Sequence, residues 1–236
     1  MNSKKDFTPM GKLFLVPTPI GNMEDVTLRA LRILKEADYV LAEDTRQTAK
    51  LFQHYDINTP LKSYHQYNEH FIKDRIIGDL SNGKKIALVS DAGTPAISDP
   101  GYLIARECVH NAIPIECLPG ATALIPALVD SGFPCDRFIF EGFLPHKKGR
   151  KKRLQEIADY NVTCVMYESP FRLLKTLEEL SFLIGNKKNV CVCRELSKIH
   201  ESIVRGTFDE VISYFKSTTV KGEIVIVIGT IQSINL

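Results

Sequence analysis

The residues best suited to chemistry lie in one loop-forming stretch, SDAGTPAISDPG, which runs from Ser90 to Gly101. It holds two carboxylates, Asp91 and Asp99, among two glycines and two prolines. Glycine lets a ligand approach the main chain, and proline fixes the shape of a loop before a ligand binds. The stretch therefore predicts a preformed binding site. The alternative is a plain strand-to-helix turn, with Asp99 near the helix cap and Pro100 at the first helical position. Twelve residues are more than such a turn requires.

Four further stretches of this kind follow predicted strands, at residues 17–22, 43–46, 119–123 and 141–145. In an open α/β sheet, ligands bind just beyond the carboxyl ends of the strands. If the strands are parallel, all five loops share one edge of a sheet. That edge would offer main-chain amides and carbonyls with few charged side chains, which suits a small ligand carrying an adenine, hydroxyls and a zwitterion better than a polyphosphate.

Apolar runs and helical patterns alternate along the chain and provide the elements that must position these loops. The predicted strands are residues 12–16, 39–42, 61–64, 86–89, 113–118, 137–140, 163–167, 190–194, 202–207 and 223–229. The predicted helices are residues 26–37, 47–55, 71–80, 102–110, 124–129, 154–159, 171–184 and 208–215. This alternation predicts an α/β fold with a largely parallel sheet.

Length and composition set the outer bounds. A chain of 236 residues, 44% of them hydrophobic, is enough for one large domain or two small ones. No apolar run reaches the roughly 18 residues of a membrane span, and the polar start of the chain does not resemble a signal peptide. The six cysteines fall mostly inside apolar patterns and form no C-x-x-C pair, so we expect reduced thiols and a cytoplasmic location.

Charge is unevenly distributed. Residues 1–144 carry 15 Lys and Arg against 18 Asp and Glu, a net −3, whereas residues 145–236 carry 15 against 10, a net +5. The sharpest change is the run HKKGRKKR at residues 146–153, in which six of eight residues are basic. We place a domain boundary there, with domains at residues 1–145 and 146–236. The positive later half predicts an anionic partner.

Several familiar sites are excluded. Residues 78–85, GDLSNGKK, nearly fit the phosphate-binding pattern G-x-x-x-x-G-K-[ST], but Lys85 replaces the magnesium-binding hydroxyl and the segment runs from helix to strand. There is no G-x-G-x-x-G dinucleotide motif, and no His or Cys cluster predicts a metal site.

A set of motifs spread over the chain resembles the tetrapyrrole methylase superfamily. These are LVPTPIGN, DVTLRAL, LAEDTR, SDAGTPAISDPG, LPGATA, FEGFLP, YESPFR, CRELSKIHE and GEIVIVI, from about Leu13 to Gly229. Within the superfamily, the AEDTR, SDAGTPAISDPG and YESPFR blocks are similar to the bacterial 16S rRNA (cytidine-2′-O)-methyltransferases. The resemblance implies two α/β domains with mixed, largely parallel sheets, S-adenosylmethionine in a cleft between them, and a homodimer.

The resemblance also implies methyl transfer to the ribose 2′-hydroxyl of a cytidine in the decoding centre of 16S rRNA, within the small ribosomal subunit. The cofactor contacts that it implies are Pro19, Ile20, Gly21, Asp91, Gly93, Thr94, Pro95, Thr122, Ala123, Met166, Tyr167 and Leu196. The basic run becomes the expected RNA contact, through Lys147, Lys148, Arg150, Lys151, Lys152 and Arg153. Its alternative is a solvated linker helix.

Methyl transfer from a sulfonium requires alignment of three atoms and no metal. Because a ribose hydroxyl is a weak nucleophile, a base or a polarising cation should assist. The candidates are Asp44, Arg46, Glu168, Glu195 and Lys198, followed by Glu141, Arg172 and Arg194. For each, the alternative is a surface salt bridge or a helix cap. Aromatic candidates for stacking a flipped-out base are Tyr64, Tyr67 and Phe143.

Two other functions stay open from the sequence. One is methylation of a tetrapyrrole or a protein side chain on the same fold. The other is a non-catalytic RNA-binding assembly factor, although intact cofactor loops argue against it.

Overall fold

The computed structural model describes residues 11–230. The chain divides after Thr122 into two compact units. The first unit holds a five-stranded sheet in the order β3-β2-β4-β1-β5, and every neighbouring pair is parallel. Its strands are Lys12–Leu15 (β1), Tyr39–Ala42 (β2), Leu61–Ser63 (β3), Lys85–Val89 (β4) and Ile115–Cys117 (β5). The parallel arrangement brings the predicted loops after β1, β2, β4 and β5 to one edge. The fifth predicted loop, residues 141–145, does not join them, because residues 141–143 lie in a strand of the second unit, which pairs within another sheet.

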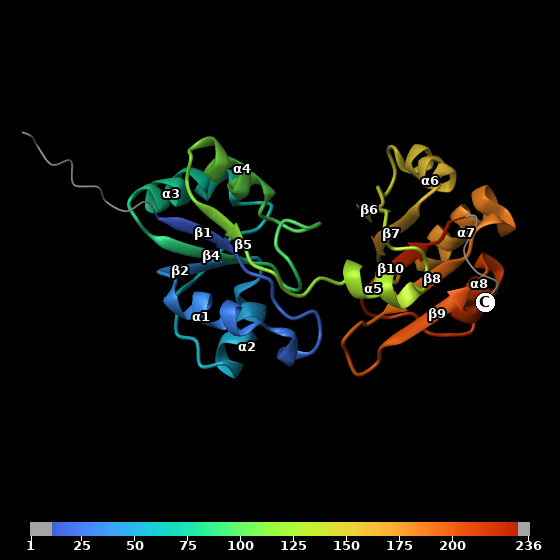
Figure 1. The fold of residues 1–236 in the computed structure, drawn as a ribbon, viewed down its shortest axis with the longest axis horizontal. Coiled ribbons are helices and arrows are strands. Elements are labelled where there is room, and N and C mark those ends of the chain that lie inside the picture. The colour runs from blue at the N-terminus through green and yellow to red at the C-terminus, as the bar shows by residue number, and fades with distance from the viewer. Residues whose placement is uncertain (1–10, 231–236) are drawn as a thin grey trace, which may run out of the picture. The chain divides into compact units, whose positions relative to one another are not determined.

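Helices cover both faces of this first sheet (Figure 1). They are Met23–Asp25 (η1), Leu28–Glu36 (α1), Thr45–His54 (α2), Glu69–Ser81 (α3) and Tyr102–His110 (α4). Side chains of α1 and α2 form one apolar core with Phe14 and Val89, and those of α3 and α4 form the other with Leu13 and Leu88. Successive strand residues face opposite sides, so strands buried on both faces are continuously apolar.

The second unit holds a mixed sheet in the order β6-β7-β10-β8-β9. β6 and β7 are parallel, whereas the other neighbouring pairs are antiparallel. The strands are Phe138–Phe143 (β6), Thr163–Glu168 (β7), Val190–Arg194 (β8), Ser202–Gly206 (β9) and Ile224–Ile228 (β10). The two sheets together confirm the predicted α/β class with mixed, largely parallel strands.

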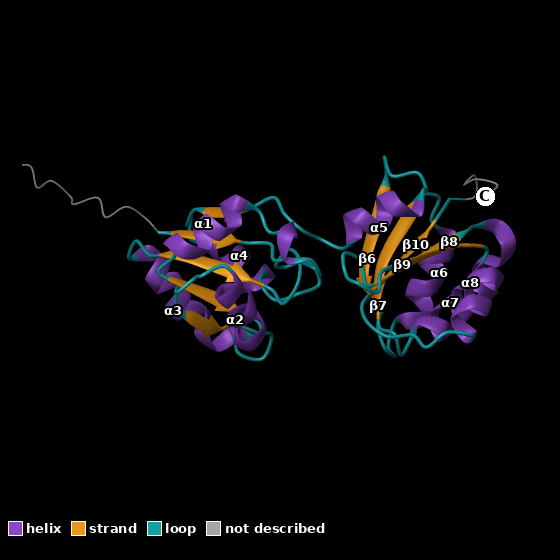
Figure 2. Cartoon of the chain, turned by 90° about the horizontal axis from the view of Figure 1, so that it is seen from below, coloured by secondary structure: helices purple, strands orange, loops and turns teal. Residues whose placement is uncertain are grey.

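Three helices cover one face of the second sheet, and α5 packs on its other face (Figure 2). The helices of this unit are Leu124–Ser131 (α5), Arg150–Asp159 (α6), Leu173–Ile184 (α7), Gly185–Lys187 (η2) and Phe208–Lys216 (α8). The main core lies between the sheet and α6, α7 and α8. A capping box between Thr207 and Glu210 begins α8.

The boundary between the units differs from the predicted one. The basic run at residues 146–153 was expected to separate the domains, but the second unit already begins at Ala123. The physical reason is pairing: β6 forms a parallel ladder with β7, and α5 packs against β7, β8, β9 and β10. The basic run therefore lies inside the second unit, where it enters α6.

Candidate active site at the carboxyl edge of the first sheet

The loop after β1 and the loop after β4 are joined by a short ladder. Thr18 and Gly93 exchange two main-chain hydrogen bonds, each of 2.9 Å. The Thr18 hydroxyl also donates to the carbonyl of Ser90 at 3.1 Å. Both residues of the ladder are buried, so these bonds hold two loops far apart in sequence in one fixed arrangement.

Gly93 lies at the point where three loops meet. Its φ of +83° is one that side chains disfavour. A Cβ placed on it would lie 3.5 Å from Cγ2 of Ile20 and 3.8 Å from Cα of Thr122. Ile20, Gly93 and Thr122, predicted cofactor contacts from three separate stretches, are therefore neighbours.

The loop after β5 is fixed by two further contacts. The Thr94 hydroxyl donates to the carbonyl of Ala121 at 3.0 Å. Gly120 lies so close to the first loop that a Cβ placed on it would be 2.6 Å from Cβ of Pro17. Only glycine fits at this crossing, which explains why a glycine follows the proline in the LPGATA motif.

The long loop after β4 is partly strained. Ala96 and Ser98 both adopt left-handed backbone angles, with φ of 71° and 65°. Such conformations cost about 1–3 kcal/mol each and cluster at functional sites. The same region of backbone space recurs at Glu195 and Ser197 in the CRELSK motif of the second unit.

Asp44 and Arg46, two predicted catalytic candidates, bond to one another. Asp44 caps α2 by accepting from the main-chain N–H of Arg46 at 2.9 Å, and its carboxylate pairs with the guanidinium at 2.6 Å. The hydrogen bond from Arg46 holds the pKa of Asp44 at about 2. The main-chain N–H of Asp44 donates to Oδ1 of Asp91 at 3.0 Å, and this bond joins the loops after β2 and β4.

Glu43 is the carboxylate at this edge that the sequence analysis did not select. It is half-buried, and burial is the main cause that raises its pKa, followed by the charge of Asp91. The main-chain N–H of Asp91 donates to the Glu43 carboxylate and partly offsets this rise in pKa. Its position in the AEDTR block was visible in the sequence, but its burial was not.

The remaining predicted contacts of the first unit occupy the same three loops. Pro19 and Thr94 are half-buried, Pro95 is buried, and Gly21 and Asp91 are exposed. Thr122 is half-buried, as is Ala123, the first residue of the second unit. Among residues 11–230, no three His, Cys, Asp or Glu side chains are placed to hold a metal ion.

In the second unit, Glu168 is a structural residue and not an accessible base. Its side chain is fully buried, and it accepts from the Thr176 hydroxyl at 2.6 Å and pairs with Arg172 at 2.7 Å. A main-chain N–H from Ser169 completes the set at 2.7 Å. Because these groups occupy both oxygens and exclude solvent, we discard Glu168 as a catalytic candidate.

Glu195 and Lys198 also bond to one another. Nζ of Lys198 lies 2.8 Å from Oε1 of Glu195 and 3.2 Å from Oε2 of Glu223. The Glu195 side chain also lies against Gly222. Burial raises the pKa of Glu195, but hydrogen bonds from Lys198 and from the main chain of Glu223 outweigh it and lower that pKa. The structure thus assigns both side chains a role in holding the turn before β10.

Two cofactor predictions in the second unit concern β7. Met166 is fully buried in the core beneath the helices, so its side chain is not available to a ligand. Tyr167 is half-buried and contacts the rings of Phe140 and Phe143. Leu196 is buried. The roles of Tyr167, Leu196 and the Met166 main chain stay predictions of the family resemblance.

The basic run separates into two kinds of residue. Arg150 is only 6% exposed, and it donates to Glu179 at 2.9 and 2.6 Å and to Thr176 at 2.8 Å. The prediction that Arg150 contacts RNA is therefore wrong, because its guanidinium is used to hold α6 on α7. Arg153 is exposed but pairs with Glu141 and Glu156.

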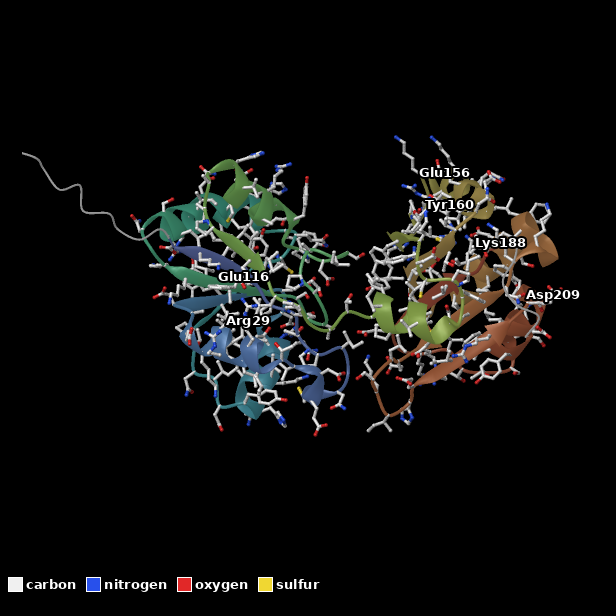
Figure 3. All side chains as sticks on the ribbon, viewed as in Figure 1. Arg29, Glu116, Glu156, Tyr160, Lys188 and Asp209 are labelled. Carbon is white, nitrogen blue, oxygen red and sulfur yellow. The ribbon has the colours of Figure 1, made fainter. Side chains whose placement is uncertain are left out.

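Four lysines of the run remain exposed, and we call them the basic-run lysines: Lys147, Lys148, Lys151 and Lys152. The far end of α6 is also fixed, since buried Lys188 donates to the carbonyls of Ala158 and Tyr160 at 2.8 and 2.5 Å (Figure 3). The helix that carries Lys151 and Lys152 is thus held at both ends.

Three aromatic residues were predicted to stack a flipped-out base, and for Tyr64 this prediction is wrong. Its ring is fully buried in the core beneath α3 and α4, and its hydroxyl donates to Glu69 at 3.2 Å. Tyr67 and Phe143 are 79% and 52% exposed and keep the rings accessible that base stacking needs. Within residues 11–230, no helix is long and apolar enough to span a bilayer.

Known proteins resemble this chain over most of its length. The sequence model of the tetrapyrrole (corrin/porphyrin) methylases matches residues 12–212. The chain is 49% identical to the Ribosomal RNA small subunit methyltransferase I of Halalkalibacterium halodurans, over 92% of this chain and 75% of that protein. It is 46% identical to the protein of that name from Thermotoga maritima, over 93% of this chain and 99% of that one.

The fold is also found among solved structures. A uroporphyrin-III C-methyltransferase from Thermus thermophilus, complexed with S-adenosylhomocysteine, matches with a TM-score of 0.66 at 21% identity. The match covers 94% of this chain and 98% of that one, and at this identity it shows the fold alone. This chain belongs to the tetrapyrrole methylase family, in the branch that contains the Ribosomal RNA small subunit methyltransferase I proteins.

Proposed function

We propose that this protein transfers a methyl group from S-adenosylmethionine to the ribose 2′-hydroxyl of a cytidine in the decoding centre of 16S rRNA. The observation that carries the proposal is the identity of 46–49% with ribosomal RNA small subunit methyltransferases, over more than nine-tenths of this chain. The structure adds geometric support, because the loops that carry these motifs converge at Gly93 and form one edge where a ligand can bind.

The carboxyl edge of the first sheet fits this cofactor in its charge. When bound, S-adenosylmethionine supplies an electrophilic methyl group on a positively charged sulfur. Glu43, Asp44 and Asp91 meet at the edge, and Asp44 is paired with Arg46. The main-chain carbonyl oxygens of the loops add partial negative charge at the same edge. A cation is therefore favoured there.

The residues proposed to hold the cofactor come from the converging loops, from β7 and from the turn after β8: Pro19, Ile20, Gly21, Asp91, Gly93, Thr94, Pro95, Thr122, Ala123, Met166 through its main chain, Tyr167 and Leu196. Their task is alignment. An in-line displacement depends on placing oxygen, carbon and sulfur in a row, and a preorganised site contributes that placement before the reaction. The Thr18–Gly93 ladder and the Thr94–Ala121 bond provide such preorganisation.

RNA binding is assigned to the basic-run lysines, which α6 and the preceding turn present to solvent. Phosphates attract exposed ammonium groups without regard to sequence, so these lysines contribute affinity and not site choice. Tyr67 and Phe143 are the aromatic rings that we propose to stack unpaired bases.

The substrate is proposed to be the small ribosomal subunit and not free rRNA, since the target lies in a folded decoding centre. The protein would then act in the cytoplasm, where ribosomal subunits are found. The family resemblance further supports a homodimer. Sedimentation equilibrium over a hundredfold range of protein concentration would distinguish a dimer from a monomer.

The decisive experiment uses S-adenosylmethionine with a labelled methyl group and small subunits that lack the modification. We expect label in 16S rRNA at one cytidine, and the linkage after it should resist alkaline cleavage, because a methylated 2′-oxygen cannot attack the phosphate. Label in RNA at a base, label in protein, or cofactor binding without any transfer to RNA would contradict the proposal.

A further inference from the structure

We propose that Glu43 is the catalytic base that accepts the proton of the ribose 2′-hydroxyl during methyl transfer. This inference rests on the proposed function and adds to it a residue for which neither the motifs nor the relatives specify a role. Three features carry it: the position of Glu43, the bonding of the other candidate carboxylates, and the groups that surround Glu43.

Glu43 lies at the carboxyl edge of the first sheet, beside the loop after β4. Glu43 follows β2 directly, and the register pairs the last residue of that strand, Ala42, with Val89 at the end of β4. The next residues of the two strands, Glu43 and Ser90, thus enter the site side by side. The main-chain N–H of Asp91 donates to the Glu43 carboxylate. Glu43 therefore contacts the loop that we assign to the cofactor, two residues from Gly93.

The other carboxylates are occupied. Asp44 is held by Arg46, and the Asp91 carboxylate accepts the main-chain N–H of Asp44. In the second unit, Glu168 is fully buried and bonded at both oxygens, and Glu195 is bonded to Lys198. A carboxylate held by a cation is a weak base, because its pKa is lowered. Glu43 has no ion pair to a lysine or arginine among residues 11–230.

The surroundings of Glu43 favour proton uptake. Burial raises its pKa, and Asp91 and Asp44 raise it further by charge, whereas the Asp91 main-chain N–H and His65 act in the opposite direction. His65 follows β3, the strand beside β2, and its Nδ1 is buried without a hydrogen-bond partner in the described structure. A base works best when its pKa lies near the working pH, so this rise improves Glu43 as an acceptor.

The transfer needs only the ribose hydroxyl, S-adenosylmethionine and the Glu43 carboxylate. The 2′-oxygen forms a bond to the methyl carbon, and the bond from that carbon to sulfur breaks with its electron pair on the sulfur. The 2′-hydroxyl proton passes to an oxygen of the Glu43 carboxylate. Glu43 then releases this proton to solvent and is ready for the next cycle.

The first test needs no turnover. The carboxyl carbon of Glu43 is assigned by ¹³C NMR, as the glutamate signal lost in Glu43→Gln, and it is titrated in the free protein. We expect its midpoint to lie above about 4.3, the ordinary pKa of a glutamate side chain. The affinity of Glu43→Gln for S-adenosylhomocysteine should equal that of the unchanged protein, which also shows that the variant is folded. A midpoint at or below about 4.3 would overturn the proposal.

The second test follows turnover on small subunits. We expect Glu43→Gln to lower kcat by about 10²–10⁴, the usual contribution of a general base, with little change in KM. The control Glu36→Gln should be indistinguishable from the unchanged protein. The rate of the unchanged protein should rise with pH through the pKa of Glu43 and then level off. In Glu43→Gln the residual rate should keep rising, because hydroxide takes the proton.

Two results would refute the role. One is a pH profile for Glu43→Gln with the original shape at a lower height, which indicates a structural effect. The other is loss of the rising limb in His65→Asn but not in Glu43→Gln, which would assign the titration to the histidine. Failure of the proposed function looks different, since the unchanged protein would then place no label at a ribose.

Discussion

Replacing Arg150 by alanine tests the division of the basic run into structural and RNA-facing residues. Arg150 is buried and makes four hydrogen bonds, two to Glu179, one to Thr176 and one of 3.4 Å to the carbonyl of Pro145. Removing one partner of a buried ion pair costs about 3–5 kcal/mol. Glu179 is 33% exposed and can recover water, so we take the lower end, about 3 kcal/mol.

The appropriate assay is native-state hydrogen exchange, because a chain of two compact units need not unfold in one step. Amides of α6 and α7 report the local opening free energy. A loss of about 3 kcal/mol corresponds to roughly a hundredfold faster exchange, at 1.4 kcal/mol for each factor of ten. The control is Lys151→Ala, the exposed neighbour, for which we expect a change within about 0.5 kcal/mol.

RNA binding provides the complementary measurement. Lys151→Ala should reduce the slope of log affinity against log salt by about 0.7, the value for one phosphate contact on a single strand. Two results together would refute our reasoning. Arg150→Ala would leave hydrogen exchange in α6 and α7 unchanged, and it would reduce the salt slope of RNA binding as much as Lys151→Ala does. They would show that Arg150 is available to phosphate.

Three further predictions concern other parts of the molecule. Neutralising all four basic-run lysines should reduce the salt slope by up to roughly 3, and should leave binding of S-adenosylhomocysteine unchanged in calorimetry. Gly120→Ala should weaken that binding at least tenfold, since the new methyl group would lie 2.6 Å from Cβ of Pro17, whereas Gly78→Ala, with open space around it, should not. At pH 8, Ellman's reagent should label Cys117 and Cys135 first, because they are the exposed thiols, and the other four only after unfolding. Burial raises the pKa of Cys108 to about 11 and that of Cys164 to about 12, so thiolate, the reactive form, is scarce there at pH 8 and increases only as the pH approaches those values. Early labelling of all six would contradict the burial.

Much of the first unit could be predicted from residue patterns. Continuous apolar runs such as that at 86–89 indicated strands buried on both faces, and the intervening helices indicated parallel pairing. Parallel pairing by itself brings the following loops to one edge, so the convergence of Ile20, Gly93 and Thr122 was predictable without coordinates. The capping role of Asp44 was also among the alternatives, since an Asp before a helical pattern commonly caps it.

Other features could not be predicted. Arg150 and Lys151 are adjacent basic residues, and nothing in their types shows that one faces α7 and the other faces solvent. The same holds for Tyr64, which is buried, and Tyr67, which is exposed. The boundary between the units was missed because the sharpest change of composition, at residues 146–153, marks an exposed turn and helix start, and not the point where strand pairing changes from one sheet to the other.

The sequence by itself therefore determined the fold class, the family and the loops that form the site, because these depend on local periodicity and on which residues a turn can accept. Tertiary structure alone decided which charged groups can act. Whether a carboxylate such as Glu43 or Asp44 serves as a base depends on its burial and on its partners. Those partners come from strands and loops distant in the chain, and no pattern within one segment contains them.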